Sequence, residues 1–212
     1  MEKFNYIAVE GVIASGKTSL AGLLAEELNA KLLLEEPEKN PFLKHFYKNP
    51  EQYAFKTQIY FLLSRYTQQV GMMQKELFHD CLISDYLFLK DRIFASVNLN
   101  ENEFSLYEKV ASLLEREINL PDLVIYLQTS IKKVMENIRK RNYYYEQNIP
   151  EEYIKELMEA YNQFFFHYKE SSLLIVNVSE MDFVNTREDF LNILGYVKNP
   201  FRGTKYVNPL KL

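Results

Sequence analysis

The sequence predicts an α/β fold in which a five-stranded parallel sheet is covered on both faces by helices, giving three layers. Short apolar runs alternate along the chain with longer segments whose apolar residues recur at helical spacing. Such nearly continuous apolar runs are typical of parallel strands that are buried on both faces. The predicted strands are residues 4–9, 31–35, 81–84, 122–128 and 173–178.

Helices are predicted between these strands. The first helix opens near Lys17, and a helix start is also indicated at Asn40-Pro41, with proline in the first turn. The segment after 197 carries prolines and a glycine, which indicates an extended tail over 198–212. We therefore expect a single domain over 1–197. The remaining predicted helical segments are 42–78 with a break near residues 49–50, 86–97, 102–118, 130–141, 150–170 and 186–197.

The composition favours a small-molecule partner over nucleic acid or a membrane. The 212 residues carry a net charge of −4, so the chain has no basic field to attract nucleic acid. No apolar run approaches the roughly 18 residues of a membrane span, and the N-terminus leads directly into the first strand. The single cysteine, Cys81, excludes an intramolecular disulfide. We expect a cytoplasmic protein in a reducing compartment.

A phosphate-binding motif follows the first strand. Residues 11–18 read G-V-I-A-S-G-K-T and match the pattern G-x-x-x-x-G-K-[ST], with a strand before it and a helix after it. Successive backbone N–H groups of such a loop point at phosphate oxygens, and the helix dipole adds positive charge. We expect ATP and Mg²⁺ here, with the lysine on the β- and γ-phosphates and the threonine on the metal. The predicted nucleotide-binding residues are Gly11, Val12, Ile13, Ala14, Ser15, Gly16, Lys17 and Thr18.

Acidic residues end the second and third predicted strands, at the edge of the sheet where a ligand binds in such folds. Glu35 and Glu36 follow the second strand, and Asp85 follows the third. An acid at the second strand would deprotonate a hydroxyl that attacks the γ-phosphate, and Asp85 would hold Mg²⁺ through water. The alternatives are a solvated loop start for the glutamates and a helix N-cap for Asp85.

A basic cluster, Arg139 to Arg141, ends the helix after the fourth strand. Its arginines would close over the phosphates and stabilise charge on the transferred group. The alternative is a solvated basic face, or pairing with the helix dipole at its C-terminus.

The middle of the chain indicates an uncharged acceptor. Between residues 36 and 95 the only arginines are Arg65 and Arg92, whereas an acceptor that already carries a phosphate is typically held by arginine forks. Aromatic and amide side chains suit a flat, neutral ring, and they favour a nucleoside over a nucleotide. Packing within a helical core explains most of the aromatics equally well. These side chains are Phe46, Tyr47, Tyr53, Phe55, Gln58 and Tyr60.

Taken in order, these motifs resemble those of the deoxynucleoside kinase family. The resemblance extends to about residue 197 and implies a three-layer P-loop kinase fold with an arginine-bearing lid at about 137–150. The first three motifs are I-A-V-E-G-V-I-A-S-G-K-T-S-L, E-E-P-E-K-N-P-F-L-K-H-F-Y and Y-A-F-K-T-Q-I-Y-F-L-L-S-R. The later ones are I-S-D-Y-L-F-L-K-D-R-I-F-A, R-N-Y-Y-Y-E-Q and D-F-V-N-T-R-E-D-F.

The resemblance assigns roles residue by residue. It implies that Glu35 is the general base, although family members with glutamate directly before proline would select Glu36. It places Asp85 beside both the substrate and the metal. Tyr47 and Glu146 match the residues that bind the sugar 3′-hydroxyl. The other matches are Gln58 at the base edge, Arg65 and Asp91 near the base, Phe94 in the pocket wall, Arg139 and Arg141 in the lid, and Asp182, Phe183 and Val184 beside the ATP adenine.

The chain departs from the family pattern at two places. Many members carry an acid-Arg-Ser triplet where this chain has Ser84-Asp85-Tyr86, so the arginine that holds the 5′-oxygen is missing. The lid, usually Arg-Gly-Arg, here reads Arg141-Asn142-Tyr143. A bacterial deoxyguanosine kinase-like branch has a similar Asp-Tyr pair, and this favours a purine acceptor.

We therefore expect an ATP-dependent deoxynucleoside kinase that acts on deoxyguanosine or deoxyadenosine. The resemblance also implies a homodimer formed through helices between 42 and 118. A thymidylate-type nucleotide kinase is the first alternative, and the scarcity of arginine in 36–95 speaks against it. A P-loop regulatory ATPase is the second. The N-K-x-D motif of guanine-reading switches is absent from the sequence.

Overall fold

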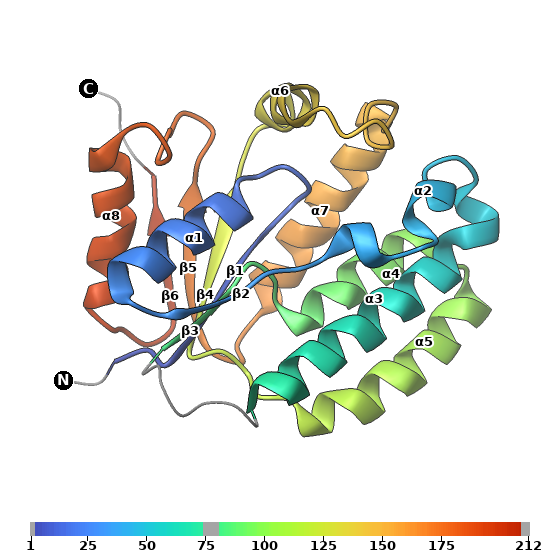
Figure 1. Ribbon diagram of the computed structural model, residues 1–212, viewed down its shortest axis with the longest axis horizontal. Helices are drawn as coiled ribbons and strands as arrows, with labels where there is room; N and C mark the ends of the chain where they lie inside the picture. Colours follow the sequence, from blue (N-terminus) through green and yellow to red (C-terminus); the bar gives the residue numbers. More distant parts are fainter. Residues whose placement is uncertain (1–2, 74–80, 209–212) are drawn as a thin grey trace.

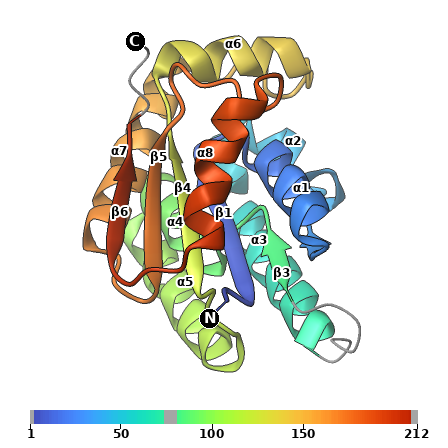
Figure 2. The same cartoon turned by 90° about the vertical axis from the view of Figure 1, so that its left-hand side faces the viewer.

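A six-stranded, fully parallel sheet forms the middle layer of the molecule (Figures 1 and 2). The computed structural model describes residues 3–73 and 81–208. The strand order is β2-β3-β1-β4-β5-β6, so the first strand and its phosphate loop lie near the centre. The strands are β1 (Tyr6–Gly11), β2 (Lys31–Leu33), β3 (Leu82–Ser84), β4 (Leu123–Gln128), β5 (Ser172–Asn177) and β6 (Thr204–Val207).

Helices cover both faces of this sheet, and one more lies across its carboxyl edge (Figure 1). On one face lie α1 (Lys17–Leu28) and α8 (Arg187–Lys198). On the other lie α4 (Asp91–Asn98) and α7 (Glu151–His167), and α6 (Ile131–Arg141) crosses above the strand ends. The remaining helices, on the outer side of α4, are α2 (Leu43–Phe46), α3 (Pro50–Met73) and α5 (Glu101–Leu114). Short 3-10 turns occupy Pro37–Lys39, Phe88–Lys90 and Glu115–Glu117.

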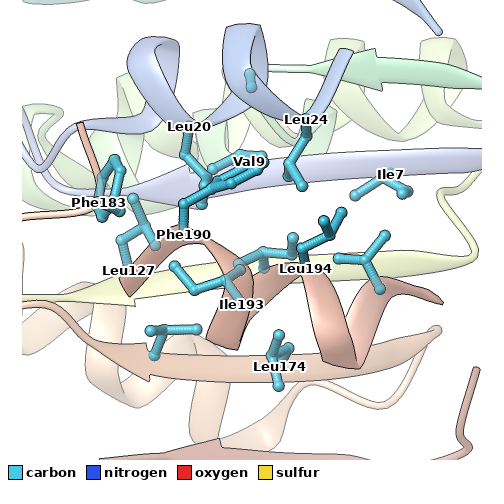
Figure 3. Close-up of a cluster of buried hydrophobic side chains, with 14 of the residues drawn as sticks. Ile7, Val9, Leu20, Leu24, Leu127, Leu174, Phe183, Phe190, Ile193 and Leu194 are labelled. Atoms are coloured by element: carbon cyan, nitrogen blue, oxygen red, sulfur yellow. The ribbon is translucent and has the colours of Figure 1, made fainter. Parts of the chain in front are cut away.

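The alternation of side chains along the buried strands divides the core into two main clusters. Ile7 and Val9 of β1 belong to one cluster with Leu20 and Leu24 of α1, and Figure 3 shows Phe190 and Leu194 of α8 in the same cluster. The intervening strand position, Ala8, faces α4 and α7 instead. Successive strand residues point to opposite faces, so strands with helices on both sides must be apolar throughout. This is why the strands appear in the sequence as continuous apolar runs.

The predicted count of five strands is wrong, because the segment expected to be an extended tail adds β6 to the sheet. This strand pairs in parallel with β5, from Leu173 opposite Thr204 to Val176 opposite Val207. The side chains of Thr204, Lys205 and Tyr206 are exposed. A strand at the sheet edge that buries little has no apolar pattern to reveal it.

The predicted helices are present with shifted ends. The segment 42–78 is divided as expected before Pro50, with α2 beginning only at Leu43, and its last part falls at 74–80, outside the described residues. The helix predicted over 86–97 begins at Asp91, after a 3-10 turn. No helix in the described parts of the chain is long and apolar enough to span a bilayer.

Packing in the core cluster between α1, α8 and the sheet predicts how substitutions in α8 change the free energy of unfolding. Phe190 is 1 % exposed, so Phe190→Ala should lower the free energy of unfolding by about 3–5 kcal/mol, through lost burial and a residual cavity. Urea unfolding measures the change. The neighbouring Leu191 is 47 % exposed, and Leu191→Ala should cost less than about 0.5 kcal/mol. Equal losses in the two variants would contradict this packing.

Candidate active site

A cavity of about 220 Å³ opens at the carboxyl edge of the sheet, where the ends of β1, β2 and β3 meet. Its walls come from the phosphate loop and the first turn of α1, the segment after β2, helices α2, α3 and α4, the segment after β3, the end of α6 with the loop that follows it, and the start of α7. The predicted site residues that line it are Ile13, Ala14, Lys17, Thr18, Glu35, Tyr47, Gln58, Arg65, Asp85, Phe94, Arg141 and Glu146.

The phosphate loop is shaped by close contacts at its two glycines. A methyl group at Gly11 would lie 2.7 Å from the Ser15 hydroxyl and 2.8 Å from the Leu127 carbonyl oxygen. Gly16 has a φ of +100°, and a methyl group there would lie 2.9 Å from Phe183. Helix α1 begins at the next residue, so the loop delivers a helix N-terminus to the cavity.

Lys17 lies folded over this loop. Its ammonium donates to the carbonyl oxygens of Gly11 at 2.8 Å and Val12 at 3.2 Å. Burial, opposed by the charge of Glu10 and reinforced by that of Lys90, lowers the pKa of Lys17 to about 8. Lys17 therefore already lies against the backbone that would hold a phosphate chain.

The Asp85 carboxylate joins the phosphate loop to the segment after β2. One oxygen accepts from the Thr18 hydroxyl at 2.6 Å, and the other accepts from the backbone N–H of Glu35 at 2.7 Å. The nearest helix, α4, begins only at Asp91, so the alternative of Asp85 as its N-cap is wrong. Asp85 instead sets the positions of Thr18 and Glu35 relative to each other.

The Thr18 hydroxyl and the Asp85 carboxylate fit a magnesium ion. Both are hard oxygen donors, they touch each other, and both line the cavity beside Lys17. Magnesium is usually held by one or two protein oxygens together with substrate phosphates. Among the described residues there is no group of three or more His, Cys, Asp or Glu side chains arranged to hold a metal.

Glu35 is clamped between two cations. Its Oε1 accepts from Arg65, and its Oε2 accepts from Lys90 at 2.8 Å. Arg65 also donates to Asp91, so one guanidinium connects both acids. Burial by itself would raise the pKa of Glu35, but the charges of Arg65 and then Lys90 lower it to about 2. Burial raises the pKa of Asp91, although Arg65 opposes this effect.

Glu36 has a different environment. It is exposed to solvent and pairs with Lys39 at 2.8 Å and with Gln68 at 3.2 Å. It does not line the cavity, whereas Glu35 does. Of the two candidate bases, the structure therefore brings Glu35 to the phosphate loop.

The side of the cavity away from the phosphate loop is lined by aromatic side chains and by the amide of Gln58. Gln58 is buried, and its Oε1 has no hydrogen-bond partner within the described residues. The Nε of Arg65 and the Oδ2 of Asp91 are also buried without a partner in the described chain. Such groups are suited to a ligand that supplies complementary donors and acceptors. Phe61, Phe94 and Tyr153 line the cavity beside them.

The loop after α6 closes the cavity with an ion pair and stacked rings. Arg141 donates twice to Glu146, at 2.8 and 2.7 Å. Tyr145 stacks against both Tyr143 and Tyr47, with ring centroids 5.6 and 6.0 Å apart. Both residues matched to the sugar 3′-hydroxyl, Tyr47 and Glu146, thus lie at this end.

Like Glu36, several other predicted site residues lie outside the cavity lining: Gly11, Val12, Ser15 and Gly16 of the phosphate loop, Asp91, which pairs with Arg65, Arg139, and the loop Asp182–Val184. Arg139 is exposed on α6, because it lies two positions before Arg141 and so points in another direction around the helix. The loop Asp182–Val184 lies beside the phosphate loop, where Phe183 is buried against Gly16 and Val184 is 57 % exposed. Asp182 accepts from the backbone N–H of Asn185 and does not reach the cavity.

Two charged residues of the site were missed by the sequence analysis. Lys90 reaches Glu35 from a 3-10 turn within an apolar stretch, and nothing in its neighbours identifies it. Glu10 is fully buried and accepts from the backbone N–H groups of Gly11 and Leu87 and from the Tyr161 hydroxyl. A carboxylate inside an apolar strand was the available signal for Glu10.

Comparison with known proteins identifies the family. The family model described as "Deoxynucleoside kinase" matches residues 7–201. The chain belongs to this family. Deoxynucleoside kinases phosphorylate deoxynucleosides, so both the resemblance seen in the sequence and the predicted class of enzyme are confirmed.

Relatives in this deoxynucleoside kinase family match over most of the chain. Deoxyguanosine kinase of Bacillus subtilis (strain 168) is 31 % identical over 198 residues, which are 91 % of this chain and 96 % of that protein. Deoxyadenosine kinase of Dictyostelium discoideum is 34 % identical over 164 residues, 75 % of this chain and 66 % of that one. The structure of deoxyadenosine kinase from M. mycoides with bound dATP aligns with a TM-score of 0.79 and 27 % identity, covering 90 % of this chain and 97 % of that one. The predicted three-layer fold is confirmed, apart from the strand count.

The close contact between Gly16 and Phe183 predicts that a larger residue at position 16 weakens ATP binding. Gly16→Ala places a side chain in a left-handed conformation and against Phe183, so it should destabilise the loop by about 1–3 kcal/mol and weaken ATP binding. Gly22→Ala in α1 meets no atom within 4 Å and should leave ATP binding unchanged. Isothermal titration calorimetry compares the two variants. Wild-type affinity in Gly16→Ala would show that the loop tolerates the change.

Proposed function

We propose that this deoxynucleoside kinase transfers the γ-phosphate of ATP to the 5′-hydroxyl of a purine deoxynucleoside. One observation carries the proposal. A single cavity holds a phosphate loop and the partly buried Glu35 carboxylate at one end, and an amide oxygen of Gln58 and the Nε of Arg65, both without a partner in the described chain, among aromatic rings at the other. The first end suits the donor and the reacting atoms, and the second suits a flat base.

In the proposed reaction Glu35 accepts the proton of the 5′-hydroxyl. The freed oxygen forms a bond to the γ-phosphorus as the bond to the β-γ bridging oxygen breaks, and ADP leaves. With a pKa of about 2, Glu35 is ionised at neutral pH and accepts a hydrogen bond from the hydroxyl. Lys17 and the lid residue Arg141, which both line the cavity, offset the negative charge on the transferred group.

Magnesium completes the proposed donor site. The chemistry that Mg²⁺ would supply there is neutralisation of part of the phosphate charge. Thr18 would hold it directly, with Asp85 behind. Asp85 also holds the backbone of Glu35, so the same carboxylate orients the metal ligand and the general base.

A purine acceptor is favoured by both the relatives and the pocket. The relatives include a deoxyguanosine kinase and a deoxyadenosine kinase, and the Asp85-Tyr86 pair resembles that of the bacterial deoxyguanosine kinase-like branch. Gln58 and Arg65, which line the cavity, supply an acceptor and a donor for the edge of a base, and Asp91 pairs with Arg65. Arg65 is committed to two carboxylates, so it is poorly placed to hold the phosphate of a nucleotide acceptor.

The proposal includes a cytoplasmic homodimer. Leu63 of α3 is 45 % exposed, and Leu106 and Leu113 of α5 are 52 % and 62 % exposed. These two helices belong to the region expected to form the dimer, and exposed leucines on neighbouring helices suit an apolar interface. The free cysteine Cys81 agrees with a reducing compartment.

A panel of deoxynucleosides tests the proposal. With wild-type protein, ATP and Mg²⁺, production of ADP should depend on added nucleoside and should be fastest with deoxyguanosine or deoxyadenosine. Deoxythymidine monophosphate serves as the nucleotide control. Turnover of that control instead of the nucleosides would favour a nucleotide kinase, and nucleoside-independent hydrolysis would favour a regulatory ATPase.

The two adjacent glutamates provide a matched test of the general base. Glu35→Ala should lower kcat at least about a hundredfold, because a positioned base is lost, while ATP binding is retained. Glu36→Ala removes a solvent-exposed carboxylate and should keep nearly wild-type kcat. Steady-state kinetics with the preferred nucleoside distinguish the variants. A wild-type kcat in Glu35→Ala together with a large loss in Glu36→Ala would assign the role of general base to Glu36.

A further inference from the structure

Lys90 is a buried cation at the reacting end of the cavity. It ends the 3-10 turn before α4, and its side chain is 3 % exposed. Its Nζ lies 2.8 Å from the Oε2 of Glu35, and it lines the same cavity as Lys17 and Thr18. Lysine is rarely buried unless its charge is paired, so this position requires an explanation beyond packing.

The geometry around Glu35 indicates different roles for Arg65 and Lys90, the two cations that pair with it. Arg65 holds Oε1 from the side of the base pocket, where its guanidinium also binds Asp91. Lys90 holds Oε2, and within the described part of the chain this is the one side-chain hydrogen bond recorded for its ammonium. An ammonium has three N–H donors, so two remain beside the cavity. Arg65 is therefore tied to the base side, whereas Lys90 can also serve the acceptor oxygen.

The remaining surroundings of Lys90 keep its charge at this position. Its Nζ lies 6.0 Å from the ring centroid of Phe94, which lines the cavity as well. The backbone N–H of Lys90 donates to Leu87, whose own N–H donates to the buried Glu10. Glu10 also accepts from Gly11 at the start of the phosphate loop. The lysine is thus anchored, through one short chain of hydrogen bonds, to the loop that binds the donor.

We propose that Lys90 is a further functional residue of the phosphoryl-transfer site, which holds the Glu35 carboxylate toward the acceptor and donates a hydrogen bond to the 5′-oxygen. The inference rests on the proposed function. As the hydroxyl proton moves to Glu35, that carboxylate loses its charge, and the positive charge of Lys90 is then balanced by the attacking oxygen and the transferred group. Such a fixed charge, set in place before the reaction, lowers the barrier without reorganisation.

Three variants and a control test the role of Lys90. Lys90→Met should lower kcat by at least about a hundredfold, the effect of losing one preorganised donor, with a much smaller change in KM for ATP. Lys90→Arg retains the charge and should recover a large part of kcat. Lys169→Met removes an exposed lysine in the segment after α7 and should behave as wild type.

Rescue of kcat by an added amine distinguishes a functional role of the Lys90 ammonium from a role of its side chain in packing alone. In Lys90→Ala, added ethylammonium should raise kcat in a saturable manner, while the same concentration of potassium chloride should not, because only the amine restores a donor in the cavity. Thermal melting of each variant verifies that it is folded. A wild-type kcat in Lys90→Met would overturn the inference. So would an equal loss in Lys90→Arg together with no amine rescue, because that pattern indicates packing alone.

The outcome for Lys90 can be distinguished from failure of the proposed function. If the wild-type protein shows no nucleoside-dependent formation of ADP, the proposed function fails before any variant is compared. If the wild type phosphorylates deoxynucleosides and Lys90→Met does so equally well, only the role of Lys90 is rejected.

Discussion

The pairing of the partly buried Glu35 carboxylate with two buried cations, Arg65 and Lys90, is the interaction on which the arrangement of the site depends. A buried charge is tolerated only when it is paired, and removing one partner of such a pair leaves an uncompensated charge. The three residues come from the segment after β2, from α3 and from the turn before α4. Their charges therefore hold three elements of the chain in one arrangement around the acceptor.

Two further carboxylates connect this arrangement to the donor side. Asp85 links Thr18 to the backbone of Glu35, and Glu10 links the phosphate loop to Leu87 and to Tyr161 of α7. Each acts by accepting hydrogen bonds from segments that are distant in the sequence. The donor and acceptor ends of the cavity are thus positioned through the carboxyl ends of neighbouring parallel strands, where ligands bind in such sheets.

The fold was predictable to the extent that burial leaves a pattern. Strands covered on both faces are apolar throughout, and five of them could be located for that reason. The sixth strand, Thr204–Val207, is mostly exposed and is held by backbone pairing to β5, which leaves no pattern in side chains. Burial also explains why the predicted start of α4 was wrong. The segment from Tyr86 to Lys90 is mostly apolar, as a buried helix would be, but it lies before the first residue of α4.

The sequence by itself determined the family, the phosphate loop and the presence of acids at the strand ends, because these depend on local motifs and residue types. Only the tertiary structure decided which of those groups share a cavity. It placed Glu35 inside and Glu36 in solvent, turned Arg141 toward the cavity and left Arg139 exposed, and brought in Lys90. Charge pairing between distant segments has no period or spacing along the chain, so it becomes visible only when the sheet has brought the segments together.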